Sequence, residues 1–279
     1  MSDSGPAEVL NDSHLRLGLR RRLAGSPLRS VVMWGRHRGL RRDDVLLAAY
    51  PKAGNTWLKF LLAHYLSDGE VGFDSVEHIV PEIGAQRDGQ RVLPRGGRLI
   101  KTHEPFRTDY RRAIYLVRDA RDVAISYYYH QLRQARFAGS LSDFVQHFVR
   151  AEADPYGGWQ RSVSSWLDSP LQASGDMLLL RYEDVRTDPP GAMRMSLEFL
   201  GLQVDDARID QAIRANRMER MREKEADSTV VLRPKRTDIP VVRKGLVGEW
   251  REALSPSDRQ AFHSYCGPLL ARLGYDANP

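Results

Sequence analysis

The chain alternates short apolar runs with longer segments in which apolar residues recur at helical spacing. Apolar runs of four to six residues that end at a polar or turn-forming residue are typical of buried strands, and three such runs lie at 45–49, 113–117 and 177–180. A further strand, of mixed composition, is predicted at 98–103. Helical patterns follow or separate them at 56–66, 120–134, 142–151, 158–167 and 188–200. Because parallel strands need long crossovers, this order predicts an α/β fold with a central parallel sheet flanked by helices on both faces.

Two long polar segments and the start of the last helix can also be predicted from the sequence. Residues 67–97 form a polar, glycine-rich stretch, whereas residues 219–244 are so highly charged and so weakly periodic that they are predicted to form a loop. The last helix is predicted to begin with Ser255 as its N-cap, Pro256 at its first position and Asp258 at its third, since each residue type is favoured at that position.

Polar groups follow the end of every predicted strand. The first strand leads into Tyr50–Trp57, and the others end at His103, Arg118 and Tyr182. In a parallel sheet the carboxyl ends of the strands share one edge, which is where ligands bind. The sequence therefore predicts one site, assembled from four strand ends.

The segment after the first strand has the composition of an anion site. A strand, a short loop and a helix N-terminus point backbone N–H groups at one spot, and the helix dipole adds partial positive charge there. Lys52 adds a cation, Gly54 permits a sharp turn and a close approach to a ligand, and Asn55 and Thr56 add side-chain donors.

Several common chemistries lack their motifs. The chain has no Gly-x-x-x-x-Gly-Lys-Ser/Thr loop, and its loop lysine precedes the glycine instead. No spacing of His, Cys, Asp and Glu resembles a zinc site, and no acidic pair follows a strand as a magnesium ligand would. Because Gly-x-Ser-x-Gly is missing too, an ordinary hydrolase is disfavoured and a metal-free reaction at an anion site fits better.

The charge is unevenly distributed. The 279 residues carry a net charge of +6, and residues 1–42 alone hold nine arginines against three acids, so the remainder sums to zero. We therefore expect a basic N-terminal extension, 1–42, before a single domain, 43–279, and we expect no nucleic-acid partner. The extension is either a solvated, partly helical tail or a segment that packs over the site or meets an acidic partner or a membrane surface.

The cysteine content and the hydropathy of the chain indicate where in the cell the protein is expected. The single cysteine, Cys266, excludes an intramolecular disulfide, and its helical spacing with Phe262 and Leu269 predicts a buried structural thiol. No apolar run approaches the length of a membrane span, and the first residues show no apolar core of the signal-peptide type. The expectation is a cytoplasmic protein without a transmembrane segment.

Five segments, from about residue 45 to 252, resemble the motifs of the cytosolic-type sulfotransferases and occur in that family's order. They correspond to its 5′-phosphosulfate loop, its catalytic Lys-Thr-His, its 3′-phosphate segment, the Tyr-Glu-Asp beside its adenine site, and its Arg-Lys-Gly-x-x-Gly-Asp-Trp motif. In this chain they are Tyr50–Trp57, Lys101–His103, Arg118–Tyr129, Tyr182–Asp184 and Arg243–Trp250. The resemblance, which is to a bacterial-type member, implies the P-loop-like sulfotransferase fold.

The resemblance implies transfer of a sulfuryl group from 3′-phosphoadenosine 5′-phosphosulfate (PAPS) to a hydroxyl or amine of a small-molecule acceptor, such as a secondary metabolite, without a metal. His103 would be the general base, Lys52 would stabilise the leaving oxygen, and Lys101 would stabilise the sulfuryl oxygens. Cofactor-binding roles would fall to three groups: Lys52, Gly54, Asn55, Thr56 and Trp57 at the 5′ end; Arg118, Ser126, Arg243, Lys244 and Gly245 at the 3′-phosphate; and Trp57, Met218 and Tyr182 at the adenine.

The chain also departs from the family pattern. Ala53 and Asn55 replace a common serine and a common threonine, and Glu104 stands where an apolar residue is usual, which places a carboxylate near the acceptor. No match to the dimerisation motif of animal members, Lys-x-x-x-Thr-Val, follows Trp250, which leaves a homodimer open. The acceptor pocket is expected to be built from residues 67–97, 130–158 and 219–242.

Two other functions remain under consideration. A magnesium-nucleotide-dependent small-molecule kinase would use the same anion cradle, but its metal ligands are missing and the lysine is displaced. A non-enzymatic nucleotide- or polyanion-binding protein would use the basic extension, but the complete pair of Lys101 and His103 disfavours it.

Overall fold

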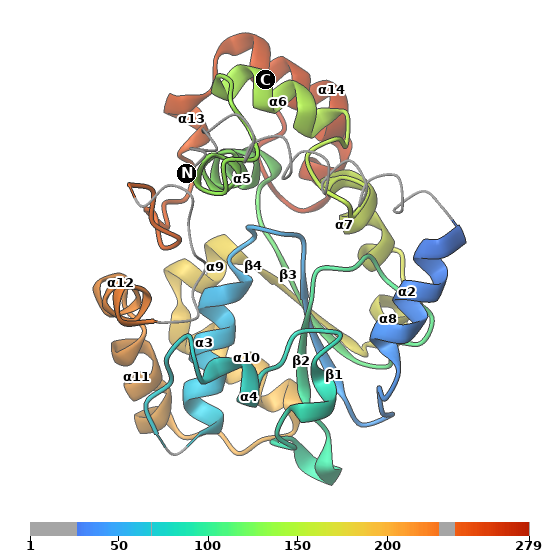
Figure 1. Cartoon of the computed structure of the whole chain (residues 1–279), viewed down its shortest axis with the longest axis vertical. Helices are drawn as coiled ribbons and strands as arrows, with labels where there is room; N and C mark the ends of the chain where they lie inside the picture. The colour runs from blue at the N-terminus through green and yellow to red at the C-terminus, as the bar shows by residue number, and fades with distance from the viewer. Residues whose placement is uncertain (1–26, 68, 229–237, 279) are drawn as a thin grey trace, which may run out of the picture.

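A computed structural model describes residues 27–67, 69–228 and 238–278. Its centre is a parallel sheet in which four strands are hydrogen-bonded in the order β2-β1-β3-β4 (Figure 1). The strands are β1 (Val45–Ala49), β2 (Leu99–Thr102), β3 (Ala113–Val117) and β4 (Met177–Arg181). All four lie at the predicted strand positions to within one residue at either end, and the predicted α/β fold is confirmed.

Both faces of this sheet are covered. In β1, Leu46 and Ala48 belong to one apolar cluster, whereas Val45, Leu47 and Ala49 belong to a second cluster on the opposite face. None of these five residues is more than 2% exposed. Successive side chains of a strand point to opposite faces, so a strand buried on both faces reads as a continuous apolar run.

Helices form the two covering layers (Figure 1). The cluster on one face takes its helical residues mainly from α5 (Ala120–Arg133), α6 (Leu141–Val149), α7 (Trp159–Leu167) and α14 (Pro256–Arg272). The cluster on the other face takes them mainly from α3 (Asn55–Leu66), α9 (Tyr182–Thr187), α10 (Pro189–Leu200) and α11 (Asp206–Ala215). The remaining described α-helices are α2 (Pro27–His37), α4 (Val76–Ile79), α8 (Pro170–Ser174), α12 (Met218–Asp227) and α13 (Trp250–Ala253).

The segment predicted to be a loop, 219–244, instead begins within helix α12. Only Met221 is buried in this helix, so the apolar periodicity that normally reveals a helix is almost absent. Its other residues are mostly arginine, glutamate and lysine, which are good helix formers without an apolar face. By contrast, α14 begins as predicted, with Ser255 and Asp258 forming a capping box.

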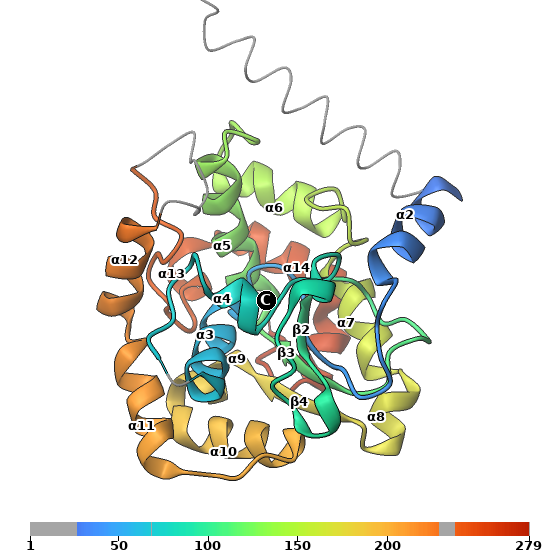
Figure 2. The ribbon, with the colours of Figure 1, turned by 60° about the horizontal axis from the view of Figure 1, so that its bottom comes forward.

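The described part of the expected N-terminal extension, 27–42, contacts the rest of the protein. Met33 and His37 of α2 are buried, and the His37 ring lies 2.8 Å from the Tyr110 hydroxyl. The Arg36 guanidinium donates to the carbonyl of Ile83 at 2.8 Å. Helix α2 thus packs on the protein, beside α7 (Figure 2), and residues 1–26 lie outside the described part.

Two further predictions concern Cys266 and the membrane. Cys266 is buried in the α14 cluster and forms no disulfide, as predicted. Burial raises the pKa of its thiol well above the usual range, which keeps it protonated and unreactive. No helix in the described ranges is both long enough and apolar enough to cross a bilayer.

A buried ion pair fixes the amino ends of β1 and β2. Arg98 contacts Asp44 through two nitrogens, at 3.0 and 2.6 Å, and also donates to the carbonyls of Gln86 and Gly39. Both side chains of the pair are at most 4% exposed. Removing one partner of such a pair leaves an uncompensated buried charge.

We therefore expect Asp44→Ala to lower the free energy of unfolding by about 3–5 kcal/mol, measured by urea denaturation. Asp43→Ala is the matched control, because Asp43 is adjacent but exposed, and it should change stability by no more than about 0.5 kcal/mol. Equal losses in the two variants would contradict a structural role for the pair.

Candidate active site

The site lies where the chain changes direction in the sheet. From β1 the chain crosses to β2 on one side, and then returns to β3 on the other side of β1. The loops after β1 and β3 therefore diverge and leave a crevice at the carboxyl edge, the usual ligand position in such sheets. A pocket of about 410 Å³ lies there, within the range of small-molecule sites.

Every residue that the sequence assigned to catalysis or cofactor binding lines this pocket. These residues are Lys52, Gly54, Asn55, Thr56, Trp57, Lys101, His103, Arg118, Ser126, Tyr182, Met218, Arg243, Lys244 and Gly245. They come from segments up to about two hundred residues apart in sequence, so the fold is what brings them together. Their individual roles remain predictions.

The loop after β1 presents unused donors. The backbone N–H groups of Lys52, Gly54, Asn55 and Thr56 have no acceptor among the described residues. The Asn55 side chain donates to the carbonyl of Leu47 at 3.2 Å, which pins the loop to β1. Four N–H groups at the start of a twelve-residue helix form an anion cradle.

Two glycines are required by their surroundings. Gly54 has φ of 98°, and a Cβ there would lie 2.3 Å from the Tyr182 ring. Gly245 has φ of 61°, and its Cβ would lie 2.5 Å from the terminal methyl of Met218. Both contacts are far below van der Waals distance, so the pocket wall closes around these positions only because they lack side chains.

Lys52 lies among other cations. It adopts φ of 70°, a left-handed conformation that is strained for a lysine. Burial, together with the positive charges of Lys101, Arg118, Arg133 and Arg243, lowers the pKa of its ammonium to about 8. Such a group gains from a bound anion, which would relieve this repulsion.

His103 is held as a neutral base. Its Nδ1 lies 2.8 Å from the carbonyl of Ala49, which only accepts, so Nδ1 carries the proton and Nε2 keeps its lone pair. Burial lowers the pKa of the imidazole to about 4, with a further contribution from Lys101. Lys101 in turn contacts Glu82 at 3.1 Å.

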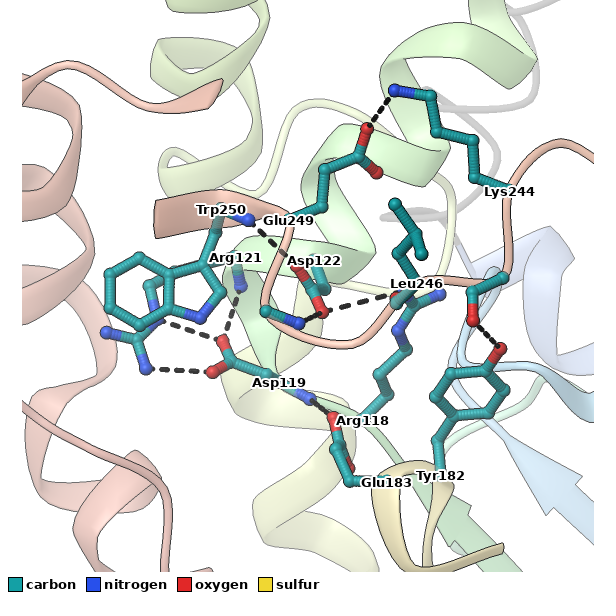
Figure 3. Close-up of polar contacts among 12 residues, drawn as sticks. Arg118, Asp119, Arg121, Asp122, Tyr182, Glu183, Lys244, Leu246, Glu249 and Trp250 are labelled. Atoms are coloured by element: carbon teal, nitrogen blue, oxygen red, sulfur yellow. Dashed lines mark hydrogen bonds and ion pairs between the residues drawn. The ribbon is translucent and has the colours of Figure 1, made fainter. Parts of the chain in front are cut away.

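The segment 243–250 is fastened to the sheet edge (Figure 3). Asp122 accepts from the backbone N–H groups of Gly248 and Trp250, at 2.7 and 3.1 Å. Arg118 donates to the carbonyl of Leu246 at 2.7 Å, and the Tyr182 hydroxyl donates to that of Gly245 at 3.2 Å. These bonds hold the end of the segment in one place against α5 and α9.

Two cations of the segment 243–250 contact the same carboxylate. Arg243 binds both oxygens of Glu249, and Lys244 lies 3.1 Å from one of them. These contacts hold the pKa of the Glu249 carboxyl below its usual range. The Arg118 Nε is buried and lacks a hydrogen-bond partner among the described residues, which leaves a donor for a ligand.

The adenine candidates lie together at one end of the pocket. The Trp57 indole N–H donates to the carbonyl of Asn216 at 3.0 Å, and the ring meets Tyr182 edge-on at 6.4 Å between centroids. The Arg186 guanidinium lies 5.0 Å from the centre of the Trp57 ring. Arg186 was not predicted from the sequence.

Sequence reasoning also missed residues at the other end. Tyr127, His130, Gln131 and Arg136 line the pocket from α5 and the turn after it. Helical spacing offered the signal for His130, because it lies one turn after Ser126 and therefore on the same face. Of the three consecutive tyrosines, Tyr127 is the one that lines the pocket, and it is also buried in the core.

Two expectations about the acceptor region are wrong. None of the lining residues comes from the described part of 67–97, whereas 130–158 and 219–242 do contribute. Glu104 does not line the pocket either: it is 5% exposed and contacts Arg36 of α2 at 3.7 Å. Successive residues of an extended segment point to opposite sides, so His103 and Glu104 diverge.

The comparisons with known proteins agree with this geometry. A family model described as "Sulfotransferase domain" matches residues 42–274. Sulfotransferase 1E1 of Cavia porcellus is 28% identical over 246 residues, which cover 81% of this chain and 82% of the relative. Sulfotransferase 2A1 of Rattus norvegicus is 28% identical over 241 residues, covering 80% and 83%. The chain therefore belongs to the sulfotransferase family.

Solved structures share the fold. The mouse sulfotransferase SULT7A1 complexed with PAP aligns with a TM-score of 0.66 and 22% identity, covering 85% of this chain and 88% of that one. Retinol dehydratase in complex with androsterone and the inactive cofactor PAP aligns with a TM-score of 0.66 and 20% identity, covering 83% and 82%. At these identities the likeness concerns the fold alone.

Gly54→Ala should damage the site and lower stability by more than about 1 kcal/mol, since the new methyl group meets the Tyr182 ring and the positive φ is unfavourable. Gly35→Ala is the control, because Gly35 lies in α2 with open space around it, and it should be neutral or stabilising by up to about 1 kcal/mol. Urea denaturation measures both, and an unchanged Gly54→Ala protein would show that the loop accommodates a side chain.

Proposed function

We propose that the protein transfers a sulfuryl group from PAPS to a hydroxyl or amine of a small-molecule acceptor, with His103 as the general base. The observation that carries this proposal is one pocket with two separate cationic regions and a neutral imidazole. The regions are the loop around Lys52 and the group formed by Arg118, Arg243 and Lys244. We also propose that the protein acts in the cytoplasm.

The residues present fit such a donor. Its two anionic ends require two anion sites, and the free N–H groups after β1 supply one. The unpartnered Arg118 Nε, with Ser126, Arg243 and Lys244, supplies the other. Gly54 and Gly245 leave room where a Cβ would fill the wall. When bound, the donor supplies an activated sulfuryl group, and the adenosine would lie near Trp57, Tyr182 and Met218.

Each catalytic side chain then has a distinct task. His103 Nε2 accepts the proton of the attacking hydroxyl, because its Nδ1 is already committed to Ala49. Lys52 stabilises the negative charge that develops on the leaving oxygen, and Lys101 stabilises the sulfuryl oxygens. The protein thus works by positioning and charge stabilisation, which is the demand of in-line transfer.

The alternatives fit less well. A magnesium-dependent kinase would need carboxylates beside the phosphates, and none of the residues that line the pocket, all within the described ranges, is acidic. A non-enzymatic anion-binding protein has no use for an imidazole with a fixed tautomer beside Lys101.

The base assignment predicts that His103→Ala loses about a hundredfold to ten-thousandfold of the turnover while it still binds adenosine 3′,5′-bisphosphate. Turnover is measured by mass spectrometry, with PAPS and a panel of acceptors, as a product heavier by one sulfuryl group. His78→Ala is the control, since His78 is exposed and does not line the pocket. Turnover by His103→Ala at the rate of this control would remove the base assignment.

The lowered pKa values of His103 and Lys52 predict a bell-shaped pH profile of kcat/KM. The reaction needs His103 neutral, so activity should rise as pH increases through about 4, and it needs Lys52 protonated, so activity should fall through about 8. Lys52→Arg should retain the acid limb but lose the alkaline limb, because arginine stays protonated.

Circular dichroism at each pH value separates loss of catalysis from loss of fold in this experiment. In kcat, measured with the donor bound, the alkaline limb should lie at higher pH, since an anion beside Lys52 favours the cation. An alkaline limb that is identical in the wild type and Lys52→Arg would assign it to another group.

A further inference from the structure

The end of the pocket away from the nucleotide sites holds groups that the proposed mechanism does not use. His130, Gln131 and Arg136 line it, together with Tyr156. Val241 and Pro155 also line the pocket. The wall is therefore mixed, with a cationic group set into a largely apolar and aromatic surface.

Arg136 is brought to the pocket by a strained turn. Helix α5 ends at Arg133, and the chain reverses with Ala135 at φ of 46°. The Arg136 N–H donates to the carbonyl of Gln131 at 2.9 Å, and the Ala135 N–H donates to that of Leu132 at 2.9 Å. This is the usual helix-ending motif, but alanine replaces the glycine that normally takes the left-handed position.

Within the described ranges the Arg136 guanidinium has no acidic partner, whereas four other cations of the wall have one. Lys101 contacts Glu82, Arg118 contacts Asp122, and Arg243 and Lys244 contact Glu249. The half-buried Arg136 guanidinium forms no hydrogen bond or ion pair within the described ranges. An arginine in a pocket without a counter-ion offers five donors in a planar fork, which suits the oxygens of an acid.

His130 lies beside Arg136 and connects this end to the transfer point. Burial, together with the positive charges of Lys52, Arg136 and Arg133, lowers the pKa of His130 to about 3. The ring is therefore neutral and supplies no negative charge to compensate Arg136. No acidic side chain lines this pocket among the described residues.

We propose that the acceptor is itself an anion: an apolar or aromatic molecule whose hydroxyl reaches His103 and whose carboxylate is bound by Arg136. This inference rests on the proposed function and names the class of its acceptor. A neutral acceptor would bury an unpaired guanidinium, at a cost in binding, whereas a carboxylate would form charge-assisted hydrogen bonds with it.

The test uses matched acceptors that differ only in charge. Hydroxyphenyl-alkanoic acids with chains of one to four carbons are each compared with the corresponding primary amide, in the wild type, Arg136→Ala and Arg136→Lys. Arg150→Ala is the matched control, because Arg150 is exposed and does not line the pocket. Sulfated product is measured by mass spectrometry at saturating PAPS.

The wild type should prefer at least one acid over its amide. Arg136→Ala should lower kcat/KM for that acid by about tenfold to a hundredfold while it changes the amide by less than about threefold, so that the preference disappears. Arg136→Lys should keep part of the preference, since a lysine retains the charge but not the fork, and Arg150→Ala should keep all of it.

A binding measurement makes the result independent of turnover. The same pairs are titrated calorimetrically into the full-length protein saturated with adenosine 3′,5′-bisphosphate, and the acid should bind more tightly than the amide only when Arg136 is present. Acids that bind and react no better than their amides, or an equal loss for both in Arg136→Ala, would overturn the inference. Transfer to the amides would then leave the proposed function standing, whereas no affinity for the bisphosphate would reject the proposed function itself.

Discussion

Repulsion between like charges is the constraint on which this structure depends. Burial is the main cause of the lowered pKa of Lys52, and the positive charges of Lys101, Arg118, Arg133 and Arg243 lower this pKa further. Left alone, such a group of cations would spread apart or lose protons. The fold instead holds them at one edge of the sheet, where a bound anion would relieve the repulsion.

Carboxylates placed behind the pocket wall make this concentration of charge possible. Glu82 pairs with Lys101, Asp122 with Arg118, Glu225 with Arg133, and Glu249 with Arg243 and Lys244. None of these acids lines the pocket. Each of these five cations therefore has an acidic partner outside the pocket lining, and the cavity itself presents positive charge to the ligand.

The same carboxylates also order the backbone. Glu225 accepts from the N–H groups of Val241 and Val242, at 2.7 and 3.0 Å, while Asp122 accepts from the segment after Leu246. Ion pairing and loop positioning thus depend on shared groups, and loss of one acid would disturb both. This explains how a segment with little regular structure, 238–249, lies against a defined site.

Sequence reasoning succeeded where one local pattern determined the outcome. Strands β1 and β3 were predictable because burial on both faces leaves only apolar residues in them. The loop at Lys52 was predictable because strand, glycine and helix follow one another directly. Helix α12 was missed because its charged residues lack apolar periodicity. The position of Glu104 could not be predicted, because it depends on contact with Arg36 of α2. The position of Arg136 could not be predicted either, because it depends on the left-handed conformation of Ala135, which no local sequence pattern indicates.

The central claim is that two separate cationic regions bind the two anionic ends of one nucleotide, and binding selectivity tests it most directly. Calorimetry without divalent cations should compare adenosine 3′,5′-bisphosphate with the 5′-monophosphate, the 3′-monophosphate and ATP. The account predicts that the bisphosphate binds at least about a hundredfold more tightly than either monophosphate, because each charged contact contributes about tenfold or more. Equal affinity for the bisphosphate and the 5′-monophosphate, or tighter binding of ATP that requires magnesium, would contradict it.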